Sequence, residues 1–167
     1  DGVGTLALVP QVVDAVRLPV AAAGGIGDGR GIAAAFAFGA CGVQIGTGFL
    51  SCPEAGTDPL RRALLRKAAE TDTMMTDAFS GRAARAMRSD YAREMEHTRI
   101  DLPDFPSLYD LSEPLLGAAD PREVSFLLYG QAARLNRELP AGELVARYVE
   151  EAAAIFAKLN SPLARNR

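Results

Sequence analysis

Short apolar runs and helix-like stretches alternate over the first 57 residues. Residues 18–23 (LPVAAA) are apolar without alternation, which is typical of a strand buried on both faces of a parallel sheet. The predicted elements are a helix from Pro10 to Val16, a strand at 18–23, a helix at 29–38 with Asp28 as its N-cap, and a strand at 42–46. This order, with its short links, predicts an α/β fold around a parallel sheet.

From residue 58 onward the hydrophobic pattern is mainly helical. The predicted elements are a helix at 59–70 opened by Asp58-Pro59, a strand at 73–79, an irregular proline-bearing loop at 99–119, a helix that starts at the capping box 120–123 and runs to Leu135, and a final helix at 141–159. The final helix has the clearest periodicity, because its apolar residues from Leu144 to Leu159 fall on one face.

Charge and composition exclude several classes of protein. The net charge of -3 and the pI near 5.2 argue against a surface for nucleic acid or anionic membrane. No apolar run approaches the roughly 20 residues that span a bilayer, and the N-terminus shows no export signal. We therefore expect a soluble cytoplasmic protein with no nucleic-acid or membrane partner.

Cysteine and histidine offer little chemistry in this chain. Cys41 and Cys52 lack the spacing of metal ligands or of a disulfide framework, and we interpret both as small buried side chains. His97 is the only histidine. It follows the polar, helix-like stretch YAREME, so we interpret it as a solvated surface residue and not as a catalytic base. The sequence predicts no metal site.

Glycine-bearing turns follow both predicted strands of the first part. Gly24-Gly25 follows the first strand, and Gly46-Thr47 ends the second. Unpaired N–H groups at such turns, with the dipole of the helix that Asp28 opens, bind phosphate readily. Since parallel neighbours place their carboxyl ends side by side, we expect one shared phosphate site. Two alternatives stay open: a tight turn that binds nothing, and a Thr47 hydroxyl that only caps a turn.

Four segments carry a resemblance to a known family. They are LVPQVVDAVRLPVAAAGGIGDGRGIAAAFAFGACGVQIGTGFLSCPEAG, TDAFSGRAARAM, FPSLYDLSEPLL and LYGQAARLNRELPAGELV, and they keep the family's order. The chain resembles the C-terminal part of nitronate monooxygenases, formerly called 2-nitropropane dioxygenases. The resemblance implies an FMN-dependent TIM (β/α)8 barrel with a smaller helical and α+β domain. It also implies oxidation of alkyl nitronates by O2 to a carbonyl compound and nitrite.

The resemblance also implies a division of the chain and a set of cofactor contacts. Residues 1–57 correspond to the last strands and helices of the FMN-binding barrel, 58–119 to an accessory domain with a crossing loop, and 120–167 to C-terminal helices that pack back on the barrel. The implied contacts with the FMN phosphate are Ala23, Gly24, Gly25, Gly46 and Thr47. These positions agree with the phosphate site expected from the glycines.

Two glutamines are weaker candidates. Gln131 is a candidate contact with the isoalloxazine or the substrate. It shares the apolar face of the helix predicted there, and Gly130 before it allows close approach. A buried glutamine bonded to backbone is the favoured alternative. Gln44 lies mid-strand among apolar neighbours, a position from which its amide would face the barrel interior. We favour a satisfied core glutamine there over a ligand contact.

The family's catalytic histidine lies in a Gly-Gly-His segment upstream of Asp1, so no catalytic residue besides Gln131 is proposed in this chain. A TIM barrel needs eight strands and about 250 residues, so we infer a C-terminal portion that requires an N-terminal half-barrel of the same protein. A homodimer is left open. Alternative functions are an FMN-dependent enoyl-acyl-carrier-protein or NAD(P)H:quinone reductase, and a non-catalytic flavin-binding half-barrel.

Overall fold

The computed structural model describes residues 2–98, 101–118, 120, 123–124 and 126–161. The chain forms two compact units, each described by itself below. Unit 1 consists of Asp1–Gly56 together with Leu135–Arg167, and unit 2 consists of Thr57–Arg134. None of the described helices is both long and apolar enough to cross a bilayer.

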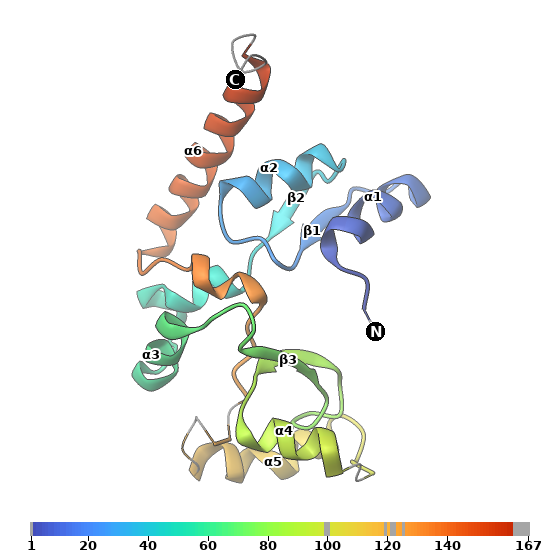
Figure 1. The fold of residues 1–167 in the computed structure, drawn as a ribbon, viewed down its shortest axis with the longest axis vertical. Coiled ribbons are helices and arrows are strands. Elements are labelled where there is room, and N and C mark those ends of the chain that lie inside the picture. The colour runs from blue at the N-terminus through green and yellow to red at the C-terminus, as the bar shows by residue number, and fades with distance from the viewer. Residues whose placement is uncertain (1, 99–100, 119, 121–122, 125, 162–167) are drawn as a thin grey trace. The chain divides into compact units, whose positions relative to one another are not determined.

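Unit 1 is built on a pair of parallel strands. Its elements are α1 (Thr5–Ala15), β1 (Ala21–Ala23), α2 (Gly29–Ala37), β2 (Gly42–Gln44), the 3-10 helices η1 (Thr47–Ser51) and η2 (Pro53–Ala55), and α6 (Ala141–Asn160). β1 and β2 pair in parallel with Ala21 opposite Gly42 and Ala23 opposite Gln44. The predicted order of helix, strand, helix and strand is confirmed (Figure 1).

The core of unit 1 lies where α2 and α6 meet the strands. Ala22 of β1, Ile32 of α2, and Leu144, Tyr148 and Ala152 of α6 belong to one buried cluster. The aromatic rings of Phe36 and Phe156 add an edge contact between α2 and α6, with centroids 6.1 Å apart. Helix α6, although all of unit 2 separates it from the strands in the sequence, is therefore an integral part of the α/β unit.

Helix α1 begins earlier than the sequence predicts. Its first turn forms where the N–H groups of Ala7 and Leu8 both donate to the carbonyl of Gly4, at 3.0 Å each. Pro10 therefore lies inside the helix and not in its first turn, so the prediction for Pro10 is wrong. Proline tolerates the first turn best because its missing N–H has no partner there.

Strand β1 is buried on one face only. Ala22 is 1% exposed, whereas its neighbours Ala21 and Ala23 on the opposite face are exposed. Successive side chains alternate between the two faces of a strand. The predicted burial on both faces is therefore wrong for the described residues: the Ala22 face packs on the core, and the Ala21–Ala23 face is left open.

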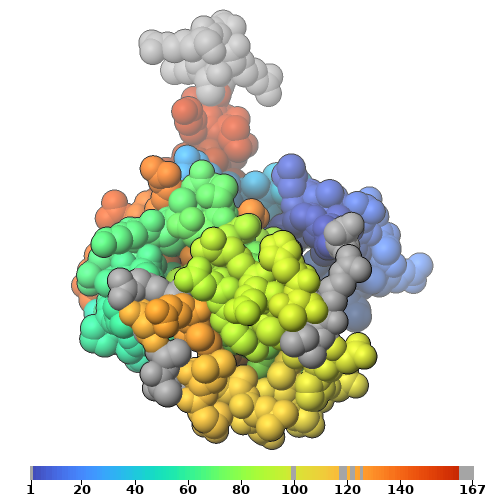
Figure 2. All heavy atoms as spheres, turned by 60° about the horizontal axis from the view of Figure 1, so that its bottom comes forward, coloured from blue at the N-terminus to red at the C-terminus, as the bar shows by residue number. Residues whose placement is uncertain are grey.

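Unit 2 combines a β-hairpin with short helices. Its elements are α3 (Pro59–Lys67), β3 (Thr73–Thr76), β4 (Ala84–Met87), α4 (Asp90–Thr98) and α5 (Ser107–Ala118), and η3 (Gln131–Leu135) follows where the chain returns to unit 1. β3 and β4 are antiparallel, with Thr73 opposite Met87. Figure 2 shows α4 in yellow-green and α5 in gold on one face of this unit. Asp58 caps α3 as predicted, accepting from the N–H groups of Leu60 and Arg61 at 3.0 Å each.

Two sequence predictions in unit 2 are wrong. The expected loop at 99–119 contains α5, in which Pro114 lies inside the helix. The helix expected from residue 120 to Leu135 is not found in the described residues, since Leu128 forms an antiparallel bridge with Ala86 and the carbonyl of Leu127 accepts from Met87 N at 2.9 Å. Pairing with β4 holds this segment extended, although its apolar residues recur at helical spacing.

Candidate functional site

The carboxyl ends of β1 and β2 lie side by side, as predicted. Because Ala23 is opposite Gln44 in the parallel register, the turns that follow the two strands start from the same edge of the sheet. The first turn contains Gly24-Gly25, and the second contains Gly46-Thr47 at the start of η1. We call the backbone of Ala23–Gly25 and Gly46–Thr47 the glycine cradle.

Glycine is needed in the cradle for two separate reasons. Gly24 and Gly25 have φ values of 96° and 74°, in the left-handed region that side chains rarely adopt. Gly46 has a φ of -98°, which any residue can adopt. A Cβ built on Gly25 or Gly46 meets no heavy atom within 4 Å, so the space beside both residues is open. Bare backbone beside open space is what a phosphate needs in order to approach main-chain N–H groups.

Thr5 supports the first turn of the cradle, and sequence reasoning missed it. Its hydroxyl donates to the carbonyl of Ala23 at 3.1 Å, and the same Oγ1 lies 3.1 Å from the position of a Cβ on Gly24. The contact joins the first residue of α1 to the end of β1. No local sequence signal indicates it, because it depends on how α1 packs beside the strand.

The N-terminus of α2 does not provide the free anion site that the sequence suggests. Asp28 caps the helix, with Oδ1 accepting from Arg30 N at 2.9 Å and from Gly31 N at 3.4 Å. The Oε2 atom of Glu151, on α6, accepts from Gly29 N at 3.1 Å. Two carboxylates of the protein thus occupy the first N–H groups of α2. An anion at this edge is left with the backbone of the cradle.

Asp28 is held as a carboxylate by its neighbours. Burial alone raises the pKa of its carboxyl, but hydrogen bonds from the Arg30 side chain and from the Arg30 and Gly31 backbone outweigh that effect. The Nε atom of Arg30 lies 2.8 Å from Oδ2, and Nη2 lies 2.5 Å from it. The net result is a pKa of Asp28 below its ordinary value. The cap remains charged down to acidic pH.

Replacing Asp28 with alanine is expected to lower the free energy of unfolding by about 1 kcal/mol at neutral pH, the usual cost of a lost N-cap. Because the folded pKa is depressed, the charged cap contributes fully above the unfolded pKa and less as pH falls through the folded pKa. The difference between wild type and Asp28→Ala, measured by urea unfolding at neutral pH and near pH 3, should therefore shrink in acid. Asp14→Ala, at an exposed position of α1, is the control. A difference that grows in acid would contradict the assignment.

Neither glutamine matches its interpretation from the sequence. Gln44 is exposed at the end of β2, opposite Ala23, so it is not a core glutamine. It lies on the open face of the sheet next to the cradle. Gln131 is exposed at the start of η3, and not on the apolar face of a longer helix as expected. It belongs to unit 2, whereas the cradle belongs to unit 1.

The remaining sequence candidates have no part in the cradle. His97 is exposed near the end of α4, as predicted. Cys52 is buried as predicted, but Cys41 is exposed. Within the described residues no group of three or more His, Cys, Asp or Glu side chains could hold a metal ion.

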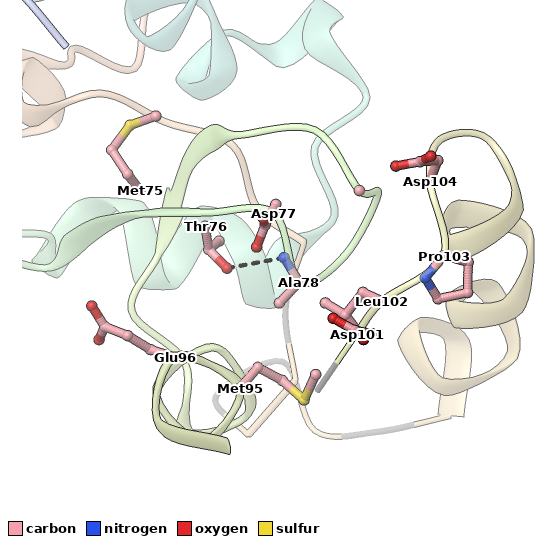
Figure 3. A pocket seen from close by; sticks show the side chains of 11 residues that line it. Met75, Thr76, Asp77, Ala78, Met95, Glu96, Asp101, Leu102, Pro103 and Asp104 are labelled. Carbon is pink, nitrogen blue, oxygen red and sulfur yellow. Dashed lines mark hydrogen bonds between the residues drawn. The ribbon is translucent and has the colours of Figure 1, made fainter. Parts of the chain in front are cut away.

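Two hollows elsewhere do not suit a phosphate. A hollow of about 470 Å³ in unit 2 is lined by four carboxylates, Asp77, Glu96, Asp101 and Asp104 (Figure 3), which would repel an anion. A groove of about 500 Å³ in unit 1, between α2, β2 and α6, is lined almost wholly by apolar side chains. The glycine cradle, by contrast, offers bare backbone beside open space.

Comparison with known proteins identifies the family. The family model for nitronate monooxygenase matches residues 1–151. A Staphylococcus aureus (strain MSSA476) protein named "Probable nitronate monooxygenase" is 40% identical over 152 residues, which cover 89% of this chain and 43% of the relative. The chain thus spans less than half the length of the curated relatives it matches.

Two solved structures share the fold. The nitroalkane oxidase of Streptomyces ansochromogenes has a TM-score of 0.87 and 38% identity, covering 95% of this chain and 46% of its own. FabK from Thermotoga maritima has a TM-score of 0.78 and 36% identity, covering 95% of this chain and 52% of its own. With the family match over residues 1–151, these similarities show that the chain belongs to the nitronate monooxygenase family.

Proposed function

We propose that the protein to which this chain belongs oxidises alkyl nitronates with O2 to a carbonyl compound and nitrite, using FMN. The chain's share is to bind the FMN phosphate through the glycine cradle. The observation that carries the proposal is the pair of glycine turns at one sheet edge, with open space beside Gly25 and Gly46. Family membership supports the oxidation of nitronates.

The residues present fit the phosphate of FMN. Its dianionic end would be held by main-chain N–H groups of the cradle, as phosphates are in other glycine-rich turns. Bound FMN would supply the electron transfer of the reaction, and the protein would hold and orient it. The exposed amide of Gln44, on the open face of β2 beside the cradle, would be available to hydrogen-bond the cofactor.

We also propose that β1 and β2 are the last strands of a TIM barrel completed by an N-terminal half-barrel of the same protein. The exposed Ala21–Ala23 face supports this, because strands in such barrels are covered on both faces. So does the length of the relatives, of which this chain covers less than half. The base expected from the resemblance, a histidine after two glycines, would lie in that half-barrel. A cytoplasmic location is part of the same proposal.

The test uses the full-length protein, purified with its native cofactor. We expect a flavin absorption spectrum, release of FMN on denaturation, and nitrite production with O2 consumption when an alkyl nitronate is added. A colourless protein that cannot be loaded with FMN would refute the flavoenzyme assignment. Bound FMN without nitrite formation would refute the nitronate reaction and leave a flavin-binding protein.

The similarity to FabK favours a second candidate, an FMN-dependent reductase of the enoyl-acyl-carrier-protein or quinone type. The two functions differ in how the flavin is reduced. In an anaerobic cuvette, NADH should bleach the flavin of a reductase within the mixing time. It should leave the flavin of a nitronate monooxygenase oxidised over the same interval. Rapid bleaching would replace the first candidate with the second.

A further inference from the structure

Helix α6 touches the chain just beyond both turns of the glycine cradle. At the first contact, Glu151 accepts hydrogen bonds from Gly29 N through Oε2 and from Arg137 Nη1 through Oε1, at 3.1 and 2.6 Å. A Cβ on Gly29 would overlap Glu151 Cβ and come within 2.6 Å of Ala152 N. Gly29 follows the first turn by four residues and begins α2. The close approach therefore fixes the end of the loop that carries Gly24-Gly25.

At the second contact, Tyr148 packs under η1, which begins with Thr47. A Cβ on Gly48 would overlap the Tyr148 hydroxyl oxygen, and the Tyr148 ring makes an edge contact with Phe49 at 6.3 Å between centroids. Tyr148 is only 4% exposed, and its hydroxyl has no hydrogen-bond partner in the described residues. Gly48 is thus required by the packing of α6 and not by the conformation of the turn.

The segment before α6 makes a third contact with the second turn. Asn136 Nδ2 donates to the carbonyl of Thr47 at 2.9 Å and to Ser51 Oγ at 3.2 Å. The start of α6 is fixed in turn, because Glu54 Oε1 accepts from Ala141 N at 2.9 Å. These bonds join residues more than 80 positions apart. Together they fix the start of α6 and the segment before it beside the second turn.

We propose that α6 sets the geometry of the glycine cradle, with Tyr148 and Glu151 as its positioning residues. The inference rests on the proposed binding of FMN through this cradle. A phosphate accepts hydrogen bonds from two separate turns only if their N–H groups are held in one arrangement, because hydrogen bonds weaken steeply with misalignment. Tyr148 and Glu151, one helical turn apart on α6, hold the second and the first turn respectively.

The first experiment compares Glu151→Ala with Glu150→Ala in the full-length protein stripped of flavin. Glu150 is the exposed neighbour on the same helix and carries the same charge. Dissociation constants are measured for FMN and for riboflavin, which lacks the phosphate. We expect Glu151→Ala to bind FMN roughly tenfold more weakly, the effect of one misplaced hydrogen bond to a charged group. Riboflavin binding should stay within about twofold of wild type on the same reasoning. Glu150→Ala should change neither constant.

The second experiment moves the other turn and then restores it. Gly48→Ala should weaken FMN binding selectively, because its Cβ meets the Tyr148 hydroxyl. In the double variant with Tyr148→Phe the obstructing oxygen is absent, so FMN should bind as tightly as it does to Tyr148→Phe alone. If Glu151→Ala fails to fold, this pair decides the question.

Parallel losses of FMN and riboflavin affinity in folded variants would overturn the inference, since they would indicate general damage and not positioning of the phosphate turns. Unchanged FMN affinity, or no rescue in the double variant, would overturn it as well. A wild-type protein that binds no FMN refutes the proposed function itself, so the two failures are distinguishable.

Discussion

Replacing Gly46 with valine is expected to give a folded protein that binds FMN at least a hundredfold more weakly. The φ of Gly46 suits any residue, and its Cβ would meet no heavy atom within 4 Å. The valine side chain would therefore fill the open space where phosphate oxygens approach the backbone, without straining the chain. Losing two charge-assisted hydrogen bonds, at roughly 1.5–3 kcal/mol each, accounts for a loss of that size.

The measurement is a fluorescence titration of flavin-free protein with FMN, alongside thermal unfolding. Gly142→Val is the matched control, because Gly142 lies in the first turn of α6 and its Cβ also meets no heavy atom within 4 Å. Gly24 is a poorer target, since valine at a φ of 96° would destabilise the turn itself. Undiminished FMN affinity in folded Gly46→Val protein would exclude the cradle as the phosphate site.

Local signals in the sequence predicted the elements that form the cradle. The N-caps Asp28 and Asp58, the apolar strand run and the periodicity of α6 each depend on neighbouring residues. The adjacency of the two glycine turns followed from the rule for parallel strands, and the register of β1 and β2 confirms that adjacency. For the N-caps, the periodicity of α6 and the order of the elements around the cradle, sequence and structure agree.

Contacts between distant segments account for what the sequence could not predict. The helix expected near Leu128 is replaced by a bridge to Ala86, about 40 residues away. The first N–H group of α2 donates to Glu151, and all of unit 2 separates these two residues in the sequence. Gln44 has apolar neighbours in sequence, but the alternation along β2 places it on the open face.

The glycine run that follows β1 serves more than one purpose. Gly24 and Gly25 need their left-handed backbone, whereas Gly29 has ordinary helical geometry and is needed for space. The same holds in the second turn, where Gly46 lies beside open space and Gly48 lies against Tyr148. The number of glycines in these two segments is therefore larger than the number that border the proposed phosphate site. Two of these five glycines, Gly29 and Gly48, serve the packing of α6.

Gly29→Ala should be strongly destabilising, lowering the free energy of unfolding by about 3 kcal/mol. In an ordinary helix, alanine in place of glycine stabilises by up to about 1 kcal/mol. Here the added methyl would overlap Glu151 Cβ and lie 2.6 Å from the backbone atoms Ala152 N and Glu151 C, so α6 must shift as a whole. Gly142→Ala, an exposed position within α6, is the control and should be neutral or stabilising. Urea unfolding of the full-length variants measures both effects. If Gly29→Ala proved as stable as wild type, α6 would not pack against the first turn of α2, and its role behind the glycine cradle would fail with that contact.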